Sequence, residues 1–276
     1  MPELPEVRAH AERITGWLAG VAVERVEPLS FTALKSAAPL DAVKGRALDR
    51  VDQRGKYLLM RFGDLTAVTH LMQGGRLRLD DKRAKRPRGG LVRWVFADGR
   101  ALMLTEAGTE KRAGVWMVQG ETEGVEPLAR LGPEADAVEA NDLLARLHAD
   151  SRRLHGWLRD QGNVAGVGRR LANEVCYRAA LSPFAATAKL TADDADRLVV
   201  ALRDAIEEGL AFERSLDNMS ASKDRPGAVH KRDGEPCGTG DTIRAVQYRS
   251  YTIYYCPEVQ TGGKVLADNT TSRFLK

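Results

Sequence analysis

The first residues of the chain combine an amine with two carboxyl groups. The sequence begins MPELPEVRAH, and removal of the initiator Met, which a small following residue allows, leaves Pro2 as an N-terminal secondary amine. An α-amino group has a pKa of about 8, well below the value of about 10.4 for lysine, so more of it is unprotonated at neutral pH. Such an amine can attack a sugar or carbonyl carbon and form an iminium ion. Glu3 and Glu6 fall on the same first helical turn, where they could act as general acid or base.

A purely structural explanation of these residues competes with the catalytic one. Met-Pro beginnings are common, and acidic residues stabilise helix N-termini. The same holds for Lys56 in RGKYLLMRF, which follows a glycine at a turn into an expected strand. That turn could present the amine to a ligand or simply expose a solvated lysine.

A glycine-rich turn lies further along the chain, in GNVAGVGRR. Gly166 and Gly168 come just before an expected helix, where exposed backbone N–H groups can cradle a phosphate. Arg169 and Arg170 follow at once. The alternative is a tight helix–helix connection with solvated arginines.

The third feature is the cysteine pattern PCGTG … YYCPEVQ near the C-terminus. Only Cys237 and Cys256 occupy positions typical of a four-cysteine zinc ribbon, because Gly240 and Val259 stand where the other two thiolates would be. Structural zinc sites are usually closed by four ligands. We therefore expect a hairpin without metal, held by apolar packing of residues such as Ile243, Ile253 and Val259. With Cys176 the chain has 3 cysteines, and this odd, sparse set argues against a disulfide framework and fits a reducing compartment.

The elements that position these residues follow from the hydrophobic pattern. Residues 3–18 show apolar residues at spacings of three and four, which predicts a helix, and Pro5 is tolerated in its first turn. Residues 20–120 contain short alternating runs broken by Gly, Asp or Pro, a pattern typical of a strand-rich sandwich or barrel. Beyond about residue 125 the pattern becomes helical, and residues 237–262 again favour strands.

Composition excludes several classes of protein. Of the 276 residues, 43% are hydrophobic and 29% are charged, which is ordinary for globular chains and unlike disordered or collagen-like ones. The net charge of +4 permits a polyanionic partner without requiring one. The N-terminus has carboxylates where a secretion signal would carry basic and apolar residues, so a cytoplasmic protein is expected.

Together these motifs resemble the formamidopyrimidine-DNA glycosylase/endonuclease VIII family. The resemblance covers nearly the whole chain and rests on MPELPEV, RGKYLL, HL-x-x-G-GRL, KRAGVW, WLRDQ-x-x-VAGVG and the PC … YYCP remnant, which occur in the family's order. It implies an α+β multidomain fold: an N-terminal β-sandwich with its N-terminal helix (1–124), a helix–two-turn–helix domain (125–230) and a zincless finger hairpin with a tail (231–276). DNA would be gripped between the domains.

The resemblance also implies a bifunctional DNA glycosylase and AP lyase of base excision repair. Pro2 would attack the sugar of a flipped-out nucleotide with a damaged, oxidised base and form a Schiff base, and β,δ-elimination would cut the strand. Glu3 would be the general acid, supported by Glu6, and Lys56 would complete the catalytic group. Further DNA contacts would come from His70, Gln73, Arg112, Gly166, Gly168, Arg169 and Arg249. The partner would be double-stranded DNA with damaged bases or abasic sites, bound by a monomer without cofactor or metal.

The sequence departs from the family at the positions that read the lesion. Ala113 stands where one branch has an aromatic wedge, and Gln73 where the same branch has an apolar plug that fills the gap left by the flipped base. Arg169 replaces the usual Asn after G-V-G. Tyr251 takes the place of the finger arginine. Either Arg249, two residues away on the same face of a strand, replaces that arginine, or the contact is lost along with the zinc.

Two other functions compete with the enzyme. A degenerate paralogue could bind damaged or abasic DNA without cutting it, as the loss of the wedge, the Asn and two cysteines suggests. Retention of Pro2, Glu3, Glu6 and Lys56 argues against a pure binder. An RNA-binding protein that shares the helix–two-turn–helix would explain neither the sandwich nor the N-terminus.

Overall fold

The computed structural model describes residues 1–276 except 37, 86, 108–109, 217–220, 249 and 267–276. It divides into two compact units, the first made of residues 1–130 with 210–224 and the second of residues 131–209 with 225–276. Among the described residues, no helix is both long and apolar enough to cross a membrane.

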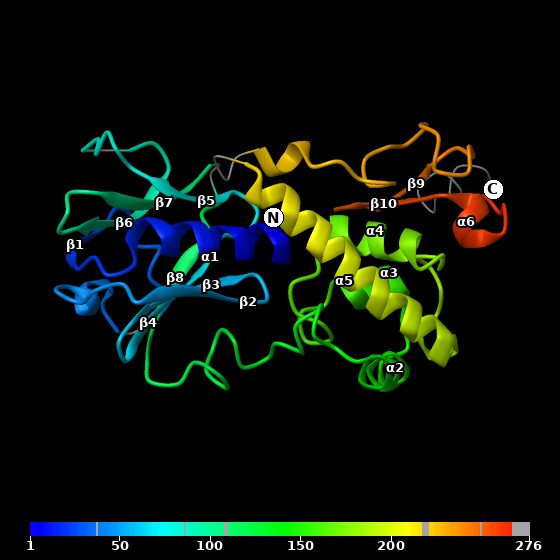
Figure 1. Ribbon diagram of the computed structural model, residues 1–276, viewed down its shortest axis with the longest axis horizontal. Coiled ribbons are helices and arrows are strands. Elements are labelled where there is room, and N and C mark those ends of the chain that lie inside the picture. The colour runs from blue at the N-terminus through cyan, green and yellow to red at the C-terminus, as the bar shows by residue number, and fades with distance from the viewer. Residues whose placement is uncertain (37, 86, 108–109, 217–220, 249, 267–276) are drawn as a thin grey trace. The chain divides into compact units, whose positions relative to one another are not determined.

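The first unit contains two four-stranded antiparallel sheets, with strand orders β1-β6-β7-β5 and β2-β3-β4-β8 (Figure 1). Their strands are β1 (Val23–Pro28), β2 (Arg50–Arg54), β3 (Tyr57–Phe62), β4 (Leu65–His70), β5 (Gly75–Leu79), β6 (Gly90–Phe96), β7 (Ala101–Glu106) and β8 (Gly114–Gln119). A 3-10 helix, η1 (Leu40–Val43), lies between β1 and β2. The alternating runs in the sequence thus predicted this strand-rich region correctly.

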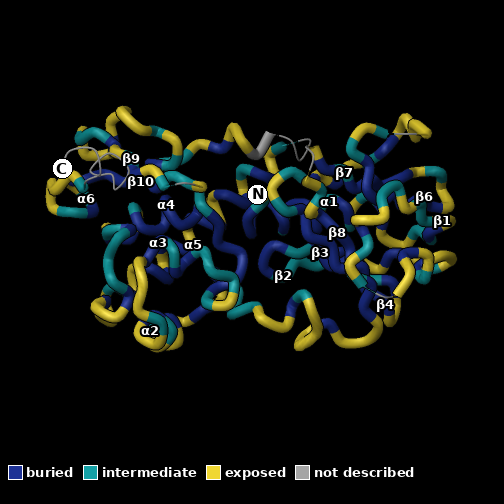
Figure 2. Tube along the Cα trace, turned by 180° about the vertical axis from the view of Figure 1, so that it is seen from behind, coloured by how far each residue is buried: buried dark blue, intermediate teal, exposed yellow. Residues whose placement is uncertain are grey.

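Helix α1 (Leu4–Leu18) packs against β2 and β3 and completes the core between the sheets. Its apolar face, which includes Val7, Ile14 and Leu18, joins one cluster with residues of both sheets, such as Met60 and Trp94. In Figure 2 the tube of these elements is largely buried, while the loops between strands are exposed. The helix that carries the N-terminal carboxyl groups is therefore fixed to the sandwich along its length.

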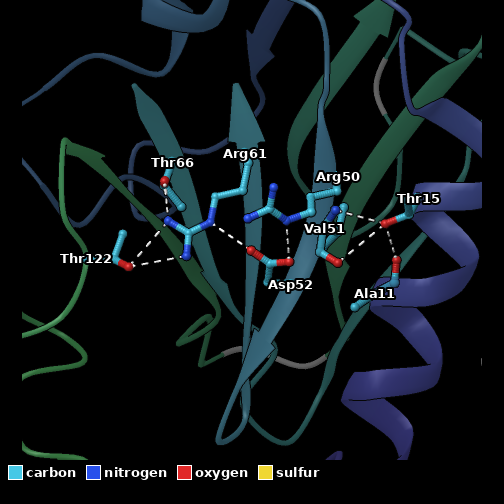
Figure 3. A network of polar contacts seen from close by, with 8 residues as sticks. All are labelled: Ala11, Thr15, Arg50, Val51, Asp52, Arg61, Thr66 and Thr122. Atoms are coloured by element: carbon cyan, nitrogen blue, oxygen red, sulfur yellow. Dashed lines mark hydrogen bonds and ion pairs between the residues drawn. The ribbon is translucent and has the colours of Figure 1, made fainter. Parts of the chain in front are cut away.

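Polar contacts reinforce the attachment of α1, as Figure 3 shows. The Thr15 hydroxyl donates a hydrogen bond to the Ala11 carbonyl oxygen (2.8 Å) and accepts one from the Val51 amide on β2 (2.8 Å). Further along this sheet, Arg61 bonds Asp52 on β2 and the hydroxyl of Thr66 on β4. These bonds tie the helix to β2 and link β2, β3 and β4 to one another.

Replacing Thr15 with valine should lower the free energy of unfolding by about 1–3 kcal/mol, because valine keeps the shape but leaves the Val51 amide without its partner. Thermal melting checks this, with Thr32→Val, at an exposed position, as the matched control. Equal melting temperatures for the two variants would show that the bond does not hold the helix.

The second unit is helical with one hairpin. Its elements are α2 (Ala140–Ala149), α3 (Leu154–Leu158), α4 (Arg169–Arg178), η2 (Thr187–Lys189), most of α5 (Ala192–Arg214), β9 (Arg244–Gln247), β10 (Thr252–Tyr255) and α6 (Pro257–Thr261). The short helix η3 (Ala221–Asp224) belongs to the first unit. Strands β9 and β10 pair antiparallel.

Helix α4 holds the segment that leads into the hairpin. The Glu174 carboxylate accepts hydrogen bonds from the amides of Ala228 (2.7 Å), Val229 (3.1 Å) and His230 (2.8 Å). The Asn173 side chain bonds the His230 ring and accepts a bond from the Tyr254 amide on β10. The hairpin and the helix are therefore one structure within this unit.

Candidate active site and nucleic-acid interface

Glu3 and Glu6 form a reciprocal cap at the start of α1. Glu3 is the N-cap residue, its amide donates to a Glu6 carboxylate oxygen (3.0 Å), and its own carboxylate accepts the Glu6 amide. Both residues are nearly buried, with 5% and 6% of their surface exposed. This arrangement serves the helix as a capping box and at the same time places two carboxyl groups directly beside Pro2.

Lys56 and His70 lie at the ends of neighbouring strands in the same unit. Tyr57 pairs with His70 across β3 and β4, and their rings are 4.5 Å apart. Lys56, which directly precedes β3, is also buried. The charges of Lys56 and of the chain's amino terminus both act on His70. The structure thus brings Lys56, His70 and the N-terminus together.

His70 is a neutral donor in this cluster. Burial, the Lys56 ammonium and the amino terminus lower the pKa of His70 to about 4. Its Nδ1 accepts a hydrogen bond from the Met72 amide (3.0 Å). In the neutral ring the proton must then reside on Nε2, so His70 offers an N–H to a ligand without adding charge.

The expected lesion-reading positions lie on two loops of the first unit. Gln73 is exposed in the turn between β4 and β5. Arg112 is exposed and paired with Glu110 (2.7 Å). Ala113 is fully buried, and its amide donates to the Glu106 carboxylate (2.8 Å). The Ala113 side chain is therefore part of the core and is not available as a wedge.

The Gln161 side chain stabilises the glycine turn of the second unit through two hydrogen bonds. The Gln161 side chain accepts a hydrogen bond from the Gly166 amide (3.0 Å) and donates to the Val167 carbonyl (2.9 Å). Gly166 has a φ of +98°, a conformation that favours glycine. Gly168 is the N-cap of α4. The Gly166 N–H expected at a phosphate is thus engaged within the protein.

Arg169 reaches the tip of the hairpin, where its guanidinium donates to the Ser250 carbonyl (3.4 Å). The neighbouring Tyr251 is stacked on Tyr248, with ring centroids 4.8 Å apart. Arg249, the candidate replacement for the finger arginine, lies outside the described residues.

The structure corrects one expectation about the finger. Cys237 and Cys256 are joined by a disulfide, with Cα atoms 6.3 Å apart, so the hairpin is not held by apolar packing alone. The packing is present as well: Ile243 belongs to the surrounding cluster, and Val259 packs against it. The count of cysteines argued against disulfides, but it carries no information about which two positions face each other across a hairpin.

Removal of metal should leave this hairpin intact. Among the described residues, no group of three or more His, Cys, Asp or Glu side chains could hold a metal ion. We expect the melting temperature of the purified protein to be unchanged by a chelator. One equivalent of zinc per chain by elemental analysis, together with unfolding on chelation, would contradict this.

His10 is a member of the N-terminal group that the motifs did not single out. It is 2% exposed, and burial, then the charges of Arg13 and Arg76, lower the pKa of His10 to about 3. The signal was present in the sequence, since Glu3, Glu6 and His10 follow at spacings of three and four and must share one helix face. In the second unit, His155 on α3 is fully buried, and burial followed by the Arg159 charge lowers the pKa of His155 to about 3.

These three histidines should make the fold acid-sensitive. The pKa values of His10, His70 and His155 lie below the ordinary 6.5. The stability that these neutral rings contribute is therefore fully present above pH 6.5. It is lost as the pH falls from 6.5 toward about 4 for His70 and about 3 for His10 and His155. At pH 5 the loss is about 2 kcal/mol for each histidine.

Melting at pH 7.5 and pH 5.0 measures this loss. A His10→Gln variant should show a smaller difference between the two melting temperatures than the unmodified protein. His148→Gln, at an exposed position, is the control. An identical pH dependence for all three proteins would refute the assignment.

Comparison with known proteins places both units in one family. A family model described as the formamidopyrimidine-DNA glycosylase N-terminal domain matches residues 1–112, and one described as the formamidopyrimidine-DNA glycosylase H2TH domain matches residues 128–220. A formamidopyrimidine-DNA glycosylase of Geobacter sulfurreducens is 31% identical over 279 residues, covering 94% of this chain and 100% of the relative.

Solved structures agree with the fold. The MutM (Fpg) protein of Thermus thermophilus has a TM-score of 0.80 at 28% identity, over 96% of this chain and 100% of that one. A Lactococcus lactis formamidopyrimidine-DNA glycosylase, solved non-covalently bound to DNA that contains an AP site, has a TM-score of 0.81 at 21% identity, over 94% and 99% of the two chains.

Proposed function

Because the chain belongs to the formamidopyrimidine-DNA glycosylase family and is thus a DNA glycosylase of base excision repair, we propose that it is also an AP lyase that uses Pro2 as nucleophile. The observation that carries this proposal is the group of buried residues around the N-terminus. Glu3, Glu6 and Lys56 are each less than a tenth exposed. Burial of carboxyl groups and amines costs free energy. These three buried groups lie close to the terminal amine, where they can serve its chemistry.

The proposed reaction divides into steps that these residues can serve. The Pro2 nitrogen attacks C1′ of the flipped-out nucleotide, the bond to the base breaks, and the base leaves with a proton. Glu3 supplies protons as general acid, and Glu6 holds the Glu3 backbone in place. The C1′–O4′ bond then breaks and O4′ takes up a proton, so that the sugar ring opens and an iminium ion joins Pro2 to C1′. This iminium ion acidifies the C2′ proton, whose loss expels the 3′ phosphate in β-elimination. A second elimination releases the 5′ phosphate.

The substrate we propose is duplex DNA with a damaged, oxidised base or an abasic site, in the cytoplasm. Support comes from structural relatives that were solved in complex with carbocyclic 8-oxo-G DNA and with AP-site DNA. Lys56, neutral His70 and exposed Arg112 would contact phosphate, and Gln73 would fill the space left by the flipped base. We further propose the functional segments 1–124, 125–230 and 231–276 predicted from the sequence.

A second candidate function is binding to abasic DNA without cutting it. The observation in its favour is Ala113, whose fully buried methyl group leaves this loop position without a wedge to hold the helix open. A protein that cannot extrude an intact damaged base could still recognise a site from which the base is gone.

Borohydride trapping separates the two candidates. The protein is mixed with duplex DNA that carries one abasic site, and the reductant converts any Schiff base into a stable adduct. We expect a trapped complex whose mass lacks Met1. Tight, selective binding without an adduct would instead establish the non-cutting binder, and a panel of damaged bases then defines the lesion removed.

A further inference from the structure

The tip of the C-terminal hairpin is packed onto helix α3 through stacked planar groups. Tyr251 lies against Tyr248, with ring centroids 4.8 Å apart and planes 11° apart. The His155 ring is stacked with Tyr251 at 5.9 Å and 14°. The Arg159 guanidinium lies 4.3 Å from the centre of the Tyr251 ring. These four side chains, two from the hairpin tip, one from α3 and one from the residue after α3, form one stack, which we call the tyrosine platform.

Two arginines, each at one end of a helix, contact the hairpin tip at the tyrosine platform. Arg159 is the residue after α3 and contacts Tyr251, while Arg169 opens α4 and donates to the carbonyl of Ser250, the next residue along the tip. Both arginines are half-buried. His155 in the same stack is fully buried and neutral, so the charge at the tip comes from the guanidinium groups and not from the imidazole.

A guanidinium that is stacked on an aromatic ring can still bind a phosphate. A guanidinium uses its flat face to stack on an aromatic ring and its N–H edge to bind the oxygens of a phosphate, so the two contacts do not compete. A side chain already held against a ring also loses less conformational freedom on binding. Tyr251 stands where the family's pattern has a finger arginine. The hairpin tip therefore supplies an aromatic ring on which a cation can stack, and not the cation itself.

We propose that Arg159 and Arg169 bind a backbone phosphate of the DNA, and that Tyr251 positions Arg159 for this contact. The inference rests on the proposed function, since it assumes a DNA substrate. In this proposal the phosphate near the hairpin tip is bound by the guanidinium groups of Arg159 and Arg169. Stacking on Tyr251 holds the Arg159 group at the tip. It also explains why a tyrosine is suitable at a position that would otherwise need a charge.

The test measures binding to a duplex with a tetrahydrofuran abasic-site analogue over a range of salt concentrations. Arg159→Ala should weaken binding roughly tenfold or more, and it should lower the slope of log affinity against log salt by about one. Arg146→Ala, which removes a half-buried, ion-paired arginine on α2, is the matched control for net charge. Arg159→Lys should recover part of the slope but less of the affinity, because an ammonium cannot stack as a plane.

Variants of Tyr251 separate positioning from direct contact. Tyr251→Phe keeps the ring and should bind DNA as the unmodified protein does, whereas Tyr251→Ala should behave like Arg159→Ala. A merely structural role of the stack would lower the melting temperature without changing the salt slope. That result, or equal behaviour of Arg159→Ala and Arg146→Ala, would overturn the proposal, and so would a loss in Tyr251→Phe equal to that in Tyr251→Ala.

Failure of the proposed catalysis would be distinguishable from failure of this inference. Trapping with borohydride at saturating protein reports the Pro2 chemistry of the unmodified protein, whereas the salt dependence of duplex binding reports the phosphate site. If the unmodified protein binds with the expected salt dependence but gives no adduct, the lyase proposal fails and the phosphate site stands.

Discussion

Pro2→Gly should reduce the trapped Schiff base on abasic DNA by at least about 100-fold. Glycine still permits removal of Met1, so an amine remains at position 2. It is a primary amine on a residue without a ring, however, and its nitrogen is no longer held in one orientation. Correct orientation of a nucleophile accounts for orders of magnitude in rate, and the ring of proline prevents rotation about its N–Cα bond.

The measurement is the rate of adduct formation, with the N-terminal mass determined for each protein. Binding to the tetrahydrofuran duplex should change little, because Pro2 contributes chemistry more than affinity. If Pro2→Gly traps as fast as the unmodified protein, another amine is the nucleophile, and Lys56 would be the first to examine.

Glu3→Gln should slow removal of a damaged base by roughly 100- to 10,000-fold, the usual contribution of a positioned general acid or base. Glutamine keeps the size of the side chain and an oxygen that can accept the capping hydrogen bond, so α1 should stay folded. Reaction with a preformed abasic site should suffer less, because the base has already left.

Glu12→Gln is the matched control, since it removes a carboxylate of the same helix that is exposed and paired with Arg214. Single-turnover rates on a damaged-base duplex and on an abasic duplex provide the comparison. Equal rates for Glu3→Gln and Glu12→Gln would remove Glu3 from the mechanism.

The long elements of this fold were predictable because their patterns are long enough to repeat. Helix α1 was expected over residues 3–18 and spans Leu4–Leu18. The alternating runs between residues 20 and 120 became strands of two sheets. Helix α3 lies where a helical run was expected before the glycine turn. The five-residue helix α6 lies where strands were expected, because about one turn and a half is too short for a helical spacing of apolar residues to repeat.

The contacts that sequence reasoning missed join residues far apart in the chain. Neither the position of Arg159 nor that of Tyr251 indicates that they stack, and the count of cysteines did not indicate that Cys237 faces Cys256. His10 is different, because its spacing from Glu6 placed it on the helix face that carries both glutamates. Its burial followed from the geometry of the helix, although no motif drew attention to it.

The reciprocal cap of Glu3 and Glu6 has a consequence for how this protein can change over generations. The atoms proposed to move protons also close the first turn of α1, so most substitutions at Glu3 would weaken the helix as well as the chemistry. Selection for a folded chain alone therefore conserves part of the catalytic apparatus. A lineage in which repair activity is relaxed would keep these carboxylates long after exposed positions such as Gln73 and Arg112 had drifted, and could regain activity through few mutations.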